Sequence, residues 1–180
     1  MSWRIEILMD INLKKLSHWG RVAFAAKCAR RVQPIFDESW PESSAARRES
    51  VEIAIQLSER SAIERRPIEG LKAAALAAGI TAGSMLAPHL YPDHVFENPE
   101  VVPDTHKSAE LASLSAKSAQ MAAEVAISDS DNSFAIAIEA YDFAINAIRD
   151  ANRQGMIEQI EVDFRDCVRE FPRQQWWKFW

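Results

Sequence analysis

The sequence has little glycine, little cysteine and no long run of strongly hydrophobic residues. Only 5 of its 180 residues are glycine, which disfavours a β-rich fold built on many tight turns. The two cysteines, Cys28 and Cys167, lie far apart in the chain and form no C-x-x-C pair. Cysteine this sparse is typical of a reduced, intracellular protein, and one long-range disulfide is the open alternative.

The sequence also shows no segment that would direct it to a membrane or out of the cell. Charges interrupt the apolar residues at its start, which is unlike a secretory signal. The longest weakly polar run, residues 73–88, is shorter and less hydrophobic than the roughly 20 apolar residues that span a bilayer. We therefore expect a cytoplasmic protein.

Alanine is present in excess. The chain contains 28 Ala, and 48% of its residues are apolar. The alanines cluster in segments whose apolar residues recur every three or four positions, which is the period of an amphipathic helix. The sequence therefore predicts an all-α fold, an irregular Ala-rich bundle of six or seven helices. We expect one domain over residues 1–180, with residues 172–180 as an aromatic C-terminal tail.

Capping residues, prolines and glycines set the expected helix ends. Ser17 lies where an N-cap belongs, and Pro34 is expected to kink or end the helix that follows. Gly155 is expected to end a later helix, as glycine often does. The expected helices cover approximately residues 2–12, 18–36, 45–65, 68–87, 106–127, 133–155 and 156–170.

The expected helix over residues 68–87 has almost no polar side. A helix that is apolar all round is usually central and buried, so we expect this one at the centre of the bundle. Gly79 and Gly83 are four residues apart on one side of it and allow a neighbouring helix to approach closely. A phosphate-binding glycine loop is not favoured, because no strand precedes the segment and no Lys-Ser/Thr pair follows it.

Residues suited to catalysis or metal binding form no established pattern. His89, Asp93, His94 and Glu97 lie in or beside a proline-rich loop and are suitable metal ligands, but their spacing matches no known site. Cys28 lies inside an expected helix, where burial is the ordinary expectation, and no G-x-S-x-G motif occurs. We therefore predict no enzymatic activity, no bound metal and no cofactor.

The net charge of −5 is unevenly distributed. Residues 1–72 carry 13 Lys and Arg against 10 Asp and Glu, whereas residues 73–180 carry 8 against 16. Acids interrupt the basic residues, and a pI of about 5.4 argues against nucleic-acid binding, so pairing within the protein explains them better. In the acidic half, four carboxylates are candidates to attract a basic protein partner, and a merely solvated surface is the alternative. They are Glu139, Asp142, Glu158 and Glu161.

The tail contains three of the six tryptophans, together with Phe179. Left exposed, these aromatic side chains would form an adhesive patch, so we expect them to be covered. A groove of the tail's own bundle is the favoured cover, and a groove of a partner or of a second copy is the alternative. Membrane anchoring is disfavoured, because only Arg173 and Lys178 add positive charge. The candidate contact residues are Trp176, Trp177 and Trp180.

The run Cys28-Ala-Arg-Arg-Val-Gln-Pro-Ile-Phe36, followed by Trp40-Pro41, resembles the opening of certain small all-helical bacterial proteins. Some of these proteins are classed as immunity proteins of polymorphic-toxin systems. The resemblance implies a bacterial inhibitor that neutralises a toxin by direct binding, and it identifies no contact residues. The alternative is an intracellular helical scaffold that self-associates through the aromatic tail.

Overall fold

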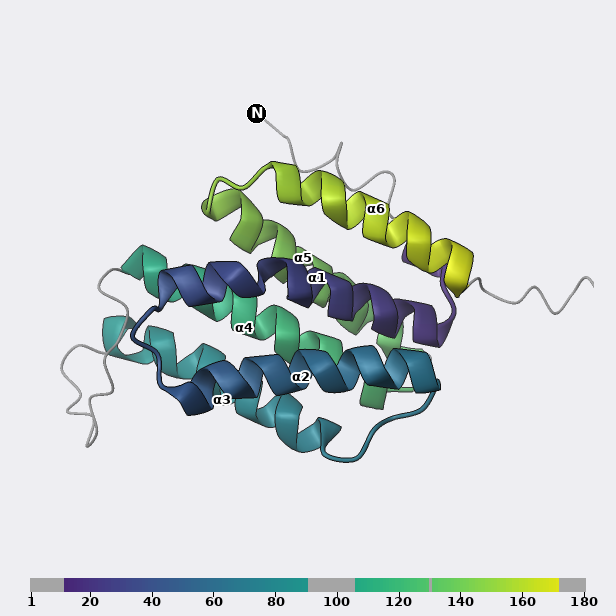
Figure 1. Ribbon diagram of the computed structural model, residues 1–180, viewed down its shortest axis with the longest axis horizontal. Coiled ribbons are helices and arrows are strands. Elements are labelled where there is room, and N and C mark those ends of the chain that lie inside the picture. Colours follow the sequence, from purple (N-terminus) through teal and green to yellow (C-terminus); the bar gives the residue numbers. More distant parts are fainter. Residues whose placement is uncertain (1–11, 91–105, 130, 172–180) are drawn as a thin grey trace, which may run out of the picture.

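The structure, a computed structural model, describes residues 12–90, 106–129 and 131–171 of the chain. Over these residues it contains six α-helices and a short 3₁₀-helix and no strand (Figure 1). The predicted all-α helical bundle is confirmed. The elements are η2 (Leu13–Lys15), α1 (His18–Ser39), α2 (Ala45–Glu64), α3 (Leu71–Leu90), α4 (His106–Ile127), α5 (Asn132–Asp150) and α6 (Gly155–Glu170).

Helices α1 and α4 form the centre of the bundle, and each packs against four other helices. Helix α3 packs on α2 and α4 at one edge, whereas α6 packs mainly on α1 at the opposite edge (Figure 1). Small side chains make the central packing possible, because alanine and serine let helix backbones approach closely. The buried alanines of α4 are Ala109, Ala112, Ala116, Ala119, Ala122, Ala123 and Ala126.

Helix α1 begins as the sequence predicts and ends later. The Ser17 side chain caps it by accepting the Gly20 backbone N–H at 3.2 Å. Pro34 does not end the helix, which continues to Ser39. The Pro34 ring lies on the exposed side, while the two residues after it are buried in the core and hold the following turn in helical conformation.

The expected end of the next-to-last helix at Gly155 is wrong. Helix α5 ends at Asp150, and Asn152 then takes a left-handed conformation with φ of 56°. Asparagine tolerates this conformation better than most residues, so it supplies the stop that the sequence assigned to glycine. Gly155 is instead the first residue of α6. The helix expected over residues 2–12 lies outside the described residues, apart from its last position.

The expected central position of the helix over residues 68–87 is also wrong. Helix α3 lies at the edge of the bundle, and α4 takes the central place. At Gly79 an added Cβ would lie 2.8 Å from the Gln120 Oε1 atom of α4, so this glycine makes room for the end of a long side chain of the neighbouring helix. At Gly83 an added Cβ would meet no atom of the described residues within 4 Å, so the close approach expected at this glycine is wrong for the described part of the chain.

In the part of the chain that the structure describes, no helix is both long enough and apolar enough to cross a membrane.

Candidate functional site

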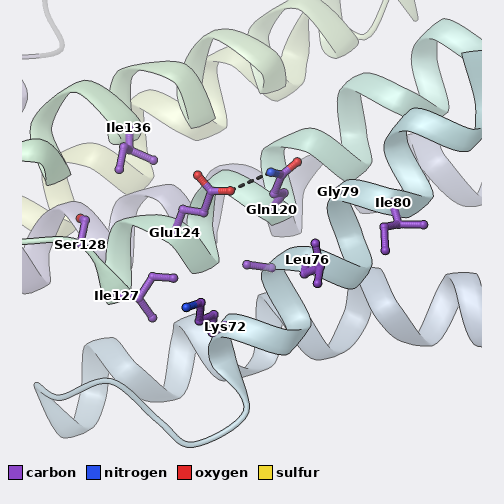
Figure 2. Close-up of a pocket in the computed structure, with 10 residues that line it drawn as sticks. Lys72, Leu76, Gly79, Ile80, Gln120, Glu124, Ile127, Ser128 and Ile136 are labelled. Atoms are coloured by element: carbon purple, nitrogen blue, oxygen red, sulfur yellow. Dashed lines mark hydrogen bonds between the residues drawn. The ribbon is translucent and has the colours of Figure 1, made fainter.

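A groove of about 580 Å³ runs along the exposed side of α4, between α3 and the start of α5. We call it the α3–α4–α5 groove. Figure 2 shows its side chains, which come from all three helices and from the residue that follows α4. They are Lys72, Ala75, Leu76, Gly79 and Ile80 of α3, Gln120, Glu124 and Ile127 of α4, Ser128 directly after it, and Ile136 of α5.

The walls of the groove are apolar and open to solvent. Leu76 and Ile80 of α3 expose 66% and 60% of their surface, and Ile127 of α4 exposes 40%. Burying such a side chain fully is worth about 1.5–3 kcal/mol, so each of these residues leaves much of that free energy unused. Contiguous exposed apolar residues of this kind mark binding surfaces in soluble proteins.

The floor of the groove carries a polar pair. Gln120 Nε2 donates a hydrogen bond of 2.7 Å to Glu124 Oε1, one helical turn along α4 (Figure 2). Gly79 leaves the space that the Gln120 side chain occupies, because a Cβ at that position would collide with the amide group. Lys72 lies in the first turn of α3 and brings a positive charge to that end of the groove.

The four acidic residues predicted to attract a partner lie outside this groove, on α5 and α6. Glu139, Asp142 and Glu158 are exposed, and Glu161 is partly buried. Two of them influence the buried Tyr141 of α5. Burial raises the pKa of its hydroxyl, and the carboxylates of Asp142 on α5 and Glu161 on α6 raise it further. Glu139 and Glu158 each lie about one turn before these residues on the same helices.

Many other charges of the protein are paired within the bundle. Arg31 of α1 donates two hydrogen bonds, of 2.8 and 3.1 Å, to the buried carboxylate of Asp163 on α6. Arg30 pairs with Glu52 at 2.7 Å and with Glu59 at 2.9 Å, and these hydrogen bonds raise the pKa of its guanidinium group. Pairing within the protein, which the sequence analysis favoured for the basic residues, is confirmed at these positions.

The two cysteines are free thiols on the facing helices α1 and α6. Both are fully buried, and burial raises the pKa of Cys28 and raises that of Cys167 to about 12. Because the thiolate is the nucleophile, a buried thiol with a raised pKa is chemically inert at neutral pH. These residues therefore act as small core side chains that help α6 pack on α1.

Metal ligands do not gather in the described part of the chain, where no group of three or more His, Cys, Asp or Glu residues could hold an ion. The candidate ligands of the proline-rich loop, Asp93, His94 and Glu97, lie outside the described residues, as does the side chain of His89. The tail residues Trp176, Trp177 and Trp180 lie outside them as well. The metal prediction and the tail prediction therefore stay predictions.

The groove is absent from the expectations drawn from the sequence, although the sequence contains one signal for it. Leu76 and Ile80 are four residues apart on a helix that lacks a polar side, so whichever side faced outward had to expose apolar residues. An apolar helix was expected to be buried on all sides, so an exposed apolar side was not predicted. Comparison of the chain with protein-family models found no matching family, and searches of curated proteins and of solved structures found no match.

Proposed function

We propose that this chain is a non-enzymatic protein-binding domain and that the α3–α4–α5 groove is its docking surface. The observation that carries this proposal is the exposure of Leu76, Ile80 and Ile127 around one concave space. The fold supplies no internal cover for these side chains among its described residues, so a second polypeptide segment is the natural occupant.

The size and lining of the groove favour an amphipathic segment of a partner. From Lys72 to Ile80 the α3 wall spans nine residues, a rise of about 12 Å or two turns of helix. A partner helix that presents apolar residues at i, i+3 or i+4 and i+7 would cover such a wall. Its polar flank would lie over the Gln120–Glu124 pair, whose remaining amide and carboxylate groups can form hydrogen bonds.

The more specific form of the proposal is an immunity-type inhibitor, which binds a toxin and blocks it. It rests on the resemblance of the Cys28–Phe36 run and on the acidic half of the chain. Asp142 and Glu161, with Glu139 and Glu158 nearby, would accelerate encounter with a basic toxin domain, because surface charges act mainly on the association rate. The groove would then supply the apolar contact that holds the complex.

Co-expression with the toxin encoded by the neighbouring gene tests this function. We expect the chain to protect cells and to copurify with the toxin. Ile80→Asp should abolish both effects, because it places a charge in the groove wall. Ile53→Asp is the matched control, because Ile53 is also an exposed isoleucine in a helix interior, on α2 and outside the groove. Protection that survives Ile80→Asp would remove the groove from the mechanism, and failure of the unmodified chain to bind or protect would refute the inhibitor.

Self-association as a helical scaffold is the second candidate, and the same exposed groove residues favour it. Here a second copy would supply the covering segment. Light scattering over a concentration series distinguishes the inhibitor from the scaffold. The measured mass of a scaffold should increase with protein concentration, and Ile80→Asp should return it to the mass of a monomer. A constant monomer mass of about 20.3 kDa would exclude the scaffold.

A further inference from the structure

We propose that in the free protein the aromatic tail, residues 172–180, occupies the α3–α4–α5 groove of its own chain, and that a partner must displace it. Binding of the tail in the groove needs no other protein. The further claim that a partner displaces the tail rests on the proposed function. Three observations carry the inference: the place where α6 ends, the length of the tail, and the match between its side chains and the groove.

Helix α6 ends at the same end of the bundle as the α2–α3 connection, which is close in sequence to the groove residue Lys72. The Phe171 carbonyl oxygen accepts the Ser17 backbone N–H at 3.1 Å, which fixes the last described residue beside the start of α1. The Arg65 guanidinium lies 5.8 Å from the centre of the Phe171 ring. Arg65 is the residue that ends α2, and α3 begins six residues later at Leu71, next to the groove residue Lys72. The chain therefore leaves the bundle at the end where α2 connects to α3 (Figure 1).

The tail is long enough to enter the groove from this end. Nine residues in extended conformation reach about 30 Å. The α3 wall of the groove takes about 12 Å of this length. The remainder, about 18 Å, is available to pass from Phe171, which lies against Arg65, around the α2–α3 connection to Lys72.

The chemistry of the tail matches the groove. Trp176, Trp177, Phe179 and Trp180 offer large apolar surfaces, and the walls offer the exposed faces of Leu76, Ile80 and Ile127. A buried indole needs an acceptor for its N–H, and the Gln120–Glu124 pair on the floor supplies carboxylate and amide oxygens. Lys178 adds a positive charge that suits Glu124.

One exposed side chain competes with the groove for the tail. Ile63, near the end of α2, exposes 78% of its surface and lies two residues from Arg65. It does not line the groove, and the carboxylate of the adjacent Glu64 already accepts hydrogen bonds from Arg60 and Arg66. We therefore assign the tail to the groove and use Ile63 as the rival site in the test.

Tryptophan emission and acrylamide quenching of the full chain test the docking without any partner. Ile80→Asp should shift the emission to longer wavelength and increase quenching, because the released indoles enter water. Ile53→Asp should leave both unchanged. In a background of Trp176→Phe, Trp177→Phe and Trp180→Phe, the effect of Ile80→Asp should disappear, which assigns it to the tail. Circular dichroism of each variant verifies that the helices are retained.

Three results would overturn the inference. In the first, Ile80→Asp leaves the tryptophan emission unchanged. In the second, Ile63→Asp produces the red shift and Ile80→Asp does not. In the third, the unmodified protein has the mass of a dimer and Ile80→Asp both returns it to a monomer and shifts the emission, which would place the tail in the groove of a second copy. Failure of this inference is distinguishable from failure of the proposed function. If the tail does not occupy the groove but the proposed function is correct, toxin binding still depends on Ile80. If the proposed function is wrong but the tail occupies the groove, the fluorescence result holds and the protein does not bind the toxin.

Discussion

Replacing Gly20 by alanine tests the contact between the start of α1 and the end of α6, from which the tail departs. A Cβ on Gly20 would lie 2.8 Å from Phe171 Cβ, 3.0 Å from the Phe171 carbonyl oxygen and 3.2 Å from Leu16 Cβ. These neighbours are backbone or β-carbon atoms, so no side-chain rotation removes the clash. The same carbonyl oxygen accepts the Ser17 N–H at 3.1 Å, so moving α6 away weakens that hydrogen bond.

Gly83→Ala is the matched control, because a Cβ there meets no atom of the described residues within 4 Å and neither glycine has a positive φ. Alanine favours the helix by up to about 1 kcal/mol relative to glycine, so Gly83→Ala should stabilise the protein by that amount. At Gly20 the same gain is opposed by overpacking of about 1–3 kcal/mol. Weakening of the Ser17–Phe171 hydrogen bond costs about 1 kcal/mol more. The net expectation is a loss of about 1–3 kcal/mol.

Urea unfolding followed by circular dichroism measures both variants on the same scale. We expect the midpoint of Gly20→Ala to fall and that of Gly83→Ala to rise, with unchanged slopes. A Gly20→Ala protein as stable as Gly83→Ala would refute the tight α1–α6 contact.

Three further predictions follow from the core. Phe24→Ala should cost about 3–5 kcal/mol in urea unfolding, because Phe24 is completely buried, and a loss below 1 kcal/mol would contradict that burial. Cys28 and Cys167 should resist a thiol reagent at pH 8 in the folded protein and react when it unfolds, because burial raises the pKa of both thiols. Rapid reaction of the folded protein would show that a thiol is exposed. Burial and the positive charge of Arg21 lower the pKa of His18 from 6.5, so the unfolded chain binds more protons and stability should fall as the pH drops through 6.5. His18→Gln should weaken this pH dependence, and an unchanged slope would contradict it.

Capping residues and residue spacing predicted where the helices lie in the sequence. They predicted less well which helices lie at the centre of the bundle and which at its edge. The Ser17 cap and the three- to four-residue spacing placed α1 correctly, because a cap and a buried stripe are properties of the segment itself. Pro34 misled the prediction of its end, because tertiary burial of Ile35 and Phe36 outweighs the local cost of proline. The end of α5 was predicted wrongly for a different reason, because Asn152 takes the left-handed conformation that the prediction assigned to Gly155.

The candidate site depended on information that periodicity does not contain. Helix α3 is apolar on every side, so its sequence cannot tell which side faces α4 and which faces solvent. In the structure Gly79 faces the Gln120 side chain of α4, whereas Leu76 and Ile80 are exposed. The acidic residues illustrate the same limit, because packing decides that Glu139, Asp142 and Glu158 are exposed and that Glu161 is partly buried.

The central claim is that the α3–α4–α5 groove is a docking surface that the protein covers with its own tail. Nuclear Overhauser effects between groove methyl groups and tail indole protons in the full, monomeric chain test it most directly. We expect cross-peaks that join Ile80, Ile127 and Ile136 to the indoles of Trp176, Trp177 and Trp180. Indoles that show cross-peaks to Ile63 instead, or to no methyl group at all, would contradict the account.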